Sequence, residues 1–263
     1  MFARLNLQLN NDDITLDKVS YICVTQQQKA CERIVRSVLD KYLSKDGYLD
    51  ASVIEKDWFP DLKAHVFLSH SHRDVDLAIR LAGYLRAKFG IETFIDSAVW
   101  GYANELLKHI DEVYCVHSKK PNGGFVYDYE LRNLSTAHVH LILQGALAKM
   151  INCCEALVFL NTPNSLLVSD ICDLTEIASP WIYSELLMAN TFPIRDLSYY
   201  REQKNIRTKD VFAHSDLRIK YKVNLTDFVN VELEDFRVAA AKTSIKTACN
   251  ILDQLYLDKG LII

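Results

Sequence analysis

A strand–helix–strand pattern in residues 64–96 constrains the fold more than any other feature of the sequence. Ala64–Leu68 is a short apolar run of the kind that forms a buried strand of a parallel sheet. Apolar residues then recur at helical spacing over 78–89, Gly90 ends the helix, and Ile91–Asp96 is a second strand. A strand, a helix and a strand within about thirty residues form a βαβ unit, which predicts an α/β fold with a parallel sheet.

The rest of the chain continues this alternation, with helical segments at both ends. Ser71 and Asp74, three residues apart, resemble a capping box at the start of the helix after the first strand. In chain order we also expect a helix over Gln26–Leu43, a loop over 97–102, a helix over 103–114, an exposed insertion over 117–129, a helix over 135–153, a buried strand over 156–160, a long loop over 161–179, a helix over 180–189, a last strand over 221–225 and a closing helix over 231–257.

These elements divide the chain into three parts. Residues 1–62 form an N-terminal helical extension, residues 63–230 form the α/β domain with an insertion at about 116–150, and residues 231–263 form a C-terminal helix packed on the same domain. Both terminal segments are expected to cover exposed sheet and core, with a role in assembly as the alternative.

Composition and charge exclude several classes of function. The net charge of -4 argues against an electrostatic surface for nucleic acid or for an anionic membrane. The first nine residues lack the layout of a signal peptide, and no run approaches the roughly 18 to 20 apolar residues that span a bilayer. The seven cysteines include no pair of CxxC motifs, so a metal site is not expected. The sequence therefore predicts a cytoplasmic protein without a metal.

Polar and aromatic residues follow the predicted strands at the points where each strand ends. In open α/β sheets, ligands bind outside the carboxyl ends of the strands, near the point where the strand order reverses. The candidate residues there are Ser69, His70 and Ser71 after the first strand, Asp96, Ser97 and Trp100 after the second, the loop from Asn161 after the third, and Trp181 and Glu185 on the helix that starts at Pro180. We therefore expect a binding site at this edge of the sheet.

Glu185 stands out among these candidates because of its position on its helix. Ile182, Leu186 and Ala189 define the face packed on the sheet, and Glu185 lies about 60° from that face, one turn after Trp181. This position predicts a carboxylate at the edge of a cleft, partly shielded by the indole. The alternative is a solvated glutamate at the border of a surface helix.

Three parts of the chain resemble, in order, the sequence boxes of Toll/interleukin receptor (TIR) domains. His65–Asp74 is similar to the first box, a strand followed by a Ser-His-Ser turn and an acidic residue. Phe94–Asp96 is similar to the end of the second strand, and Ser97–Tyr102 takes the place of the BB loop. Trp181–Leu186 matches the tryptophan–x–x–x–glutamate–leucine box in which NAD-cleaving TIR domains keep their essential glutamate. The resemblance covers roughly residues 64 to 225 and implies a flavodoxin-like parallel sheet, the TIR fold.

Two departures from the family pattern matter. The stretch Val116–Met150 is longer than a compact TIR domain needs between its second and third strands. The segment in place of the BB loop lacks the proline–glycine pair of receptor TIR domains. The second departure argues against a receptor adaptor and less against a bacterial enzyme.

The resemblance implies an enzyme that cleaves the nicotinamide–ribose bond of NAD+, with NAD+ as substrate, no cofactor and Glu185 as the catalytic residue. Nicotinamide leaves as a neutral base, so the reaction needs no general acid. Charge develops on the ribose in an oxocarbenium-like transition state, and one well-placed carboxylate stabilises that charge. A single glutamate without a metal is therefore sufficient for the reaction.

Each of the other candidate residues has a substrate-binding role and a structural alternative. Ser69 and Ser71 contact the phosphates of the substrate or only cap the helix. His70 contacts substrate or orients a neighbour, and otherwise it is a structural residue of the turn. We assign substrate binding to Ser69, His70, Ser71, Asp96, Ser97, Trp100 and Trp181; for Asp96 the alternative is to order the BB loop, and for Trp181 it is to pack against the sheet.

The product of the reaction is left open, because water gives ADP-ribose and an acceptor on the same molecule gives a cyclic product. Bacterial TIR proteins of the anti-phage system Thoeris are similar to this layout. That likeness implies self-association through the TIR domain and a downstream effector that senses a cyclic or conjugated ADP-ribose signal. Two other functions stay open: a non-catalytic TIR scaffold that acts by homotypic assembly, and an enzyme like the nucleoside deoxyribosyltransferases.

Overall fold

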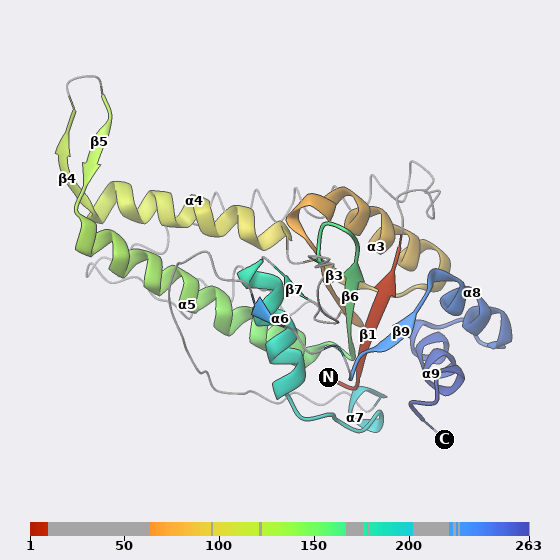
Figure 1. Cartoon of the computed structure of the whole chain (residues 1–263). Helices are drawn as coiled ribbons and strands as arrows, with labels where there is room; N and C mark the ends of the chain where they lie inside the picture. The colour runs from red at the N-terminus through yellow and green to blue at the C-terminus, as the bar shows by residue number, and fades with distance from the viewer. Residues whose placement is uncertain are drawn as a thin grey trace.

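A five-stranded parallel sheet organises the structure, which is a computed structural model (Figure 1). It describes residues 1–9, 64–95, 97–120, 123–166, 176–177, 179–201, 221–222, 225 and 227–262. In spatial order the strands are β3 (Thr93–Ile95), β2 (Val66–Ser69), β6 (Ala156–Asn161), β1 (Ala3–Gln8) and β9 (Val229–Val231). All four pairings between neighbours are parallel, so every strand ends at the same edge of the sheet.

Helices cover both faces of the sheet, as the side-chain alternation of buried strands requires. One face, with Leu5 and Leu68 on it, packs against α3 (Val75–Phe89), α8 (Leu233–Lys242) and α9 (Ala248–Asp258). The opposite face, with Phe67 and Phe159 on it, packs against α4 (Ser97–Tyr114), α5 (Tyr129–Cys153) and α6 (Pro180–Thr191). Smaller elements are the 3-10 helix η2 (His72–Asp74), α7 (Ser198–Arg201) and the two-stranded sheet of β7 (Glu176–Ile177) and β8 (Tyr221–Lys222). The sequence therefore predicted the α/β class correctly.

The first strand of the sheet is one that the sequence analysis did not predict. Residues 1–62 were expected to be a helical extension, but Ala3–Gln8 is a strand that pairs with both β6 and β9. The sequence alternates strictly here, with Ala3, Leu5 and Leu7 facing one core. That period of two is the signature of a strand. The helix expected over Gln26–Leu43 lies outside the described residues.

The position of β1 also decides the strand order. A flavodoxin-like sheet has the order 2-1-3-4-5 along the chain. Here β3, β2, β6 and β9 occupy the second, first, third and fifth positions of that pattern, and the N-terminal strand β1 occupies the fourth. The sheet is compatible with a flavodoxin-like arrangement whose fourth strand comes from the start of the chain.

The expected insertion is a regular structure that extends away from the sheet. Antiparallel strands β4 (Val116–Lys119) and β5 (Phe125–Tyr127) form a hairpin at the far end of α4 and α5, which lie side by side (Figure 1). The insertion expected over 117–129 is this hairpin, whose strands are largely exposed, as predicted. The helix expected from 135 starts earlier, because α5 begins at Tyr129. The side chain of Asp128 accepts a hydrogen bond from Leu131 N at 2.9 Å, which caps this earlier start.

Of two further expectations near the C-terminus, one is wrong and one is confirmed only in part. A single helix was expected over 231–257, but β9 and two helices occupy this region, and Thr247 caps the second helix by accepting from Asn250 N at 3.3 Å. The strand expected over 221–225 is the two-residue β8, which pairs with β7 outside the main sheet. Among the described helices, none combines the length and the apolar character needed to cross a bilayer.

Candidate active site

The main candidate site lies where β2 and β6 end side by side. From β2 the chain passes to β3 on one side of the sheet. The next strand of this sheet after β6 is β9, which lies on the other side. The strand order therefore reverses between β2 and β6, and ligands of open α/β sheets bind at such a point. Ser69 is the last residue of β2 and Asn161 the last of β6.

Ser69 and Glu185 form a direct hydrogen bond at this point. The Ser69 hydroxyl donates to Glu185 Oε2 at 2.5 Å, and both side chains are 0% exposed. Alternation along β2 turns Ser69 to the same face as Phe67, the face that packs against α6. Helix α6 is set in place by Pro180 in its first turn and by the Ser179 side chain, which accepts from Ile182 N at 3.3 Å. The structure thus brings together two residues that the sequence analysis selected.

Glu185 is more deeply buried than the sequence analysis expected. It was expected at the edge of a cleft, but it lies within the buried stripe of α6 together with Ile182, Leu186 and Ala189. The reason is geometric: an apolar helix stripe is at least about 100° wide, so a residue about 60° from Ile182 still falls inside it. The carboxylate is thus part of the packed interface between α6 and the sheet.

Trp181 packs toward α5. Its ring makes an edge-to-face contact with His140, with centroids 5.3 Å apart and an interplanar angle of 85°. Nearby, the Ser184 hydroxyl donates to Gln144 Oε1 at 2.6 Å across the same pair of helices. Both contacts hold α6 against α5. The contact with His140 gives the half-buried indole of Trp181 a structural role at this interface.

His70 and Ser71 lie in the turn after β2, and both are buried. His70 Nδ1 is 3.2 Å from Leu68 O, so one ring nitrogen faces the backbone of its own turn. Ser71 caps η2, because its side chain accepts from Arg73 N at 3.4 Å. Both residues thus make the contacts of their structural alternatives, a turn residue for His70 and a helix cap for Ser71.

Asp74 does not complete the capping box that the sequence suggested. Its carboxylate instead accepts from Thr162 Oγ1 at 2.5 Å and from Asn164 Nδ2 at 2.7 Å. These hydrogen bonds tie the turn after β2 to the loop after β6, on either side of the reversal point. The sequence analysis missed this link, since no local pattern shows that two segments separated by 88 positions meet.

The three candidates after the second strand are described only in part. Asp96 lies outside the described residues, and Ser97 and Trp100 are described by their backbone alone, in the first turns of α4. The loop expected over 97–102 is therefore wrong, because α4 begins at Ser97. Gly101 alone does not break the helix, since one glycine costs only about 1 kcal/mol relative to alanine.

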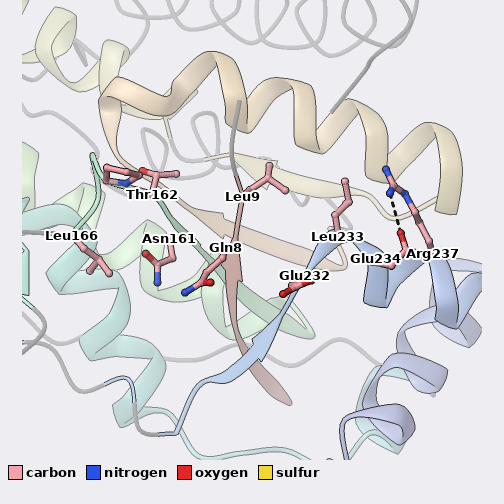
Figure 2. Close-up of a pocket in the computed structure, with 10 residues that line it drawn as sticks. Gln8, Leu9, Asn161, Thr162, Leu166, Glu232, Leu233, Glu234 and Arg237 are labelled. Atoms are coloured by element: carbon pink, nitrogen blue, oxygen red, sulfur yellow. Dashed lines mark hydrogen bonds and ion pairs between the residues drawn. The ribbon is translucent and has the colours of Figure 1, made fainter. Parts of the chain in front are cut away.

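A cavity of about 560 Å³ lies at the same edge of the sheet, over the ends of β6, β1 and β9 (Figure 2). Its lining residues are Gln8, Leu9, Asn161, Thr162, Pro163, Leu166, Glu232, Leu233, Glu234 and Arg237. Two of its lining residues also contact the elements around the Ser69–Glu185 pair, because Thr162 bonds to Asp74 and Leu166 packs against the cluster that contains Ile182 and Leu186. Among the described residues, the Asn161 loop is the one predicted site segment in the lining.

The strand that carries Gln8 explains why the cavity was missed. Strict alternation over Ala3–Gln8 is the signal that predicts this strand and places Gln8 at its end. No signal in the sequence shows that this strand ends beside β6. Within the described ranges, no group of three or more His, Cys, Asp or Glu side chains is arranged to hold a metal ion.

Comparison of the chain with protein-family models, with curated proteins and with solved structures finds no match. Function must therefore be inferred from the residues and their geometry.

Proposed function

We propose that this chain is a TIR-like enzyme that cleaves the nicotinamide–ribose bond of NAD+, with Glu185 as the catalytic carboxylate. The observation that supports the proposal is the hydrogen bond of 2.5 Å from Ser69 to Glu185, at the reversal point of a parallel sheet. That is the part of an open α/β sheet where ligands bind. The carboxylate belongs to the Trp181–Leu186 box that resembles NAD-cleaving TIR domains.

The proposed chemistry uses the carboxylate as an electrostatic stabiliser. The bond between ribose C1′ and the pyridinium nitrogen breaks, its electron pair leaves with nicotinamide, and positive charge develops on the ribose. Glu185 stabilises that charge and accepts hydrogen bonds from the ribose hydroxyls. A buried site strengthens this interaction, because the effective dielectric constant is lower there than in water. Water then attacks C1′ and loses a proton, giving ADP-ribose; an acceptor on the same molecule gives a cyclic product.

Complete burial of Glu185 places a condition on this reaction. A ribose can replace the Ser69 hydroxyl at the carboxylate only if α6 or its surroundings move. We therefore propose that the isolated chain turns over slowly and that self-association opens the site. Such control suits a defence enzyme whose product is a signal for a downstream effector.

The second candidate is a non-catalytic scaffold that acts by assembly. The same burial favours it, since Ser69 already donates to Glu185 Oε2 inside a packed interface. In this case the carboxylate helps to position α6 on the sheet and never meets a substrate.

Product analysis separates these candidates. The purified full chain is incubated with NAD+, in dilute solution and with a crowding agent, and the products are identified by mass spectrometry. Nicotinamide together with ADP-ribose or its cyclic form supports the proposed enzyme. Absence of nicotinamide under every condition favours the scaffold. The sequence also left open an enzyme like the nucleoside deoxyribosyltransferases. A parallel incubation with two deoxynucleosides tests this alternative, because such an enzyme would exchange their bases.

A further inference from the structure

The cavity over β6, β1 and β9 has a definite chemical character. Asn161, Gln8 and Glu232 lie in a row across the ends of these three neighbouring strands (Figure 2). Gln8 and Asn161 are paired residues in the register of β1 and β6. Each carboxamide offers a donor and an acceptor, and the carboxylate of Glu232 offers acceptors. The row therefore suits a ligand with both hydroxyl groups and a heteroaromatic edge.

The charge of the lining argues against a phosphate in this cavity. Arg237 is the cationic lining residue, and its guanidinium lies 3.0 Å from Glu234 Oε2 and donates to Tyr84 Oη at 2.8 Å. Since Glu234 balances its charge, Glu232 leaves the lining net negative. An anion would be repelled here, whereas an uncharged ligand rich in hydroxyl groups would not.

Size and apolar surface complete the description. Leu9, Pro163, Leu166 and Leu233 line the cavity beside the polar row. A volume of about 560 Å³ lies inside the range of roughly 300 to 1,000 Å³ of small-molecule sites. The combination of apolar walls for a flat ring with a few polar groups that orient it is typical of such sites.

We propose that this cavity binds a nucleoside, the adenosine half of the dinucleotide whose other half reaches Glu185. The Glu232 carboxylate accepts from the ribose hydroxyls, as acidic residues do in other dinucleotide sites. The carboxamides of Gln8 and Asn161 pair with the edge of adenine, which presents an acceptor and a donor side by side.

The distance across the sheet agrees with one extended ligand. Neighbouring strands are about 4.8 Å apart, so the end of β2 and the end of β1 are separated by about 10 Å. The two nucleosides of a dinucleotide are joined by a pyrophosphate and can occupy two positions along such an edge. This inference rests on the proposed function only for the nicotinamide half of the dinucleotide. Binding of adenosine can be tested without measuring cleavage of NAD+.

Direct binding of adenosine to the full chain tests the inference. Titration calorimetry or protein NMR is used with the wild type, Asn161→Leu, Gln8→Leu and, as a matched control, Asn133→Leu on the exposed surface of α5. We expect saturable binding to the wild type, at least tenfold weaker binding to the two cavity variants and unchanged binding to Asn133→Leu. Circular dichroism melting of each variant shows that it is folded.

The outcomes distinguish this inference from the proposed function. Glu185→Gln is expected to bind adenosine as the wild type does, because Glu185 does not line the cavity. Adenosine binding that depends on Asn161, in a protein that releases no nicotinamide, supports the nucleoside site and counts against the enzyme. Nicotinamide release from NAD+ without adenosine binding, or with equal binding to Asn161→Leu, overturns the inference and leaves the enzyme standing.

Discussion

At the scale of single residues, Glu185 illustrates how a polar group is kept inside a packed interface. Its carboxylate is buried among apolar side chains of α6, and the Ser69 hydroxyl donates to it at 2.5 Å. Removing one partner of a buried pair leaves the other without compensation, which costs more than the hydrogen bond itself contributes. The sequence predicted both residues as site candidates, but their mutual contact depends on α6 lying against β2, which no local pattern encodes.

The Ser69→Ala variant tests this pair. We expect the free energy of unfolding to fall by about 1–3 kcal/mol, because Glu185 would remain buried without the hydroxyl donor. Urea denaturation measures the change. Ser118→Ala, on the exposed hairpin, is the matched control and should change stability by less than about 0.5 kcal/mol. If Ser69→Ala and Ser118→Ala have the same free energy of unfolding, the hydrogen bond from Ser69 to Glu185 does not stabilise the fold.

At the scale of elements, the segments predicted correctly are those whose own residues determine them. The strand near 66–69, the helix that ends at Gly90 and the strand 156–160 have unbroken apolar patterns, and Gly90 adopts a φ of 66° at the helix end. The hairpin, β9 and the start of α4 were missed, because their conformations depend on partners distant in sequence or on a helix continuing through Gly101.

The start of β2 contains a link that responds to pH. Glu92 N donates to His65 Nδ1 at 3.1 Å, which joins the starts of β2 and β3 and needs an unprotonated nitrogen. Burial lowers the pKa of His65 below its usual value of 6.5. The unfolded chain therefore binds this proton more readily, and stability from this residue is lost as pH falls below about 6.5.

We accordingly expect the chain to melt at a lower temperature at pH 5 than at pH 7.5. In His65→Gln this difference in melting temperature should be smaller than in the wild type. Thermal melting at both values measures it. His117→Gln, at an exposed position in β4, is the matched control and should keep the full pH dependence. An unchanged pH dependence in His65→Gln would exclude this histidine as the group responsible.

At the scale of the whole molecule, a buried ion-pair network and the proposed active site lie at opposite edges of the sheet. Just before β6, at the amino ends of the strands, the buried Glu155 accepts from Arg201 Nη2 at 3.0 Å, and Arg201 also pairs with Asp253 on α9. The Glu155 carbonyl accepts from Ala3 N at 3.2 Å, so the network lies at the start of β1. The reversal point and the cavity lie at the carboxyl ends.

Arg201→Met is expected to lower the free energy of unfolding by about 3–5 kcal/mol, because the buried Glu155 would lose its cation. Chemical denaturation measures the loss. Lys88→Met, on the exposed side of α3, removes a similar charge and should cost less than about 0.5 kcal/mol. A cost for Arg201→Met as small as that of the control would show that the network contributes no net stability.

The position of the candidate site in the fold was predictable only in outline. The rule that ligands bind at the carboxyl ends of the strands led to Ser69 and to the loop from Asn161. The other cavity residues could not be predicted, because their position depends on the strand order. Gln8 and Glu232 reach the same edge only through the pairing of β1 with β6 and β9. That pairing joins residues more than a hundred positions apart, and its register cannot be read from either segment alone.

The rate of nicotinamide release from NAD+ by the wild type, Glu185→Gln and Glu130→Gln tests the central claim most directly. Glu130 lies at an exposed position on α5, so its variant controls for the loss of one carboxylate. We expect Glu185→Gln to be slower by about 10²–10³-fold or more, the scale of removing a preorganised electrostatic contact, and Glu130→Gln to match the wild type. A folded Glu185→Gln variant that releases nicotinamide at the wild-type rate would contradict the claim.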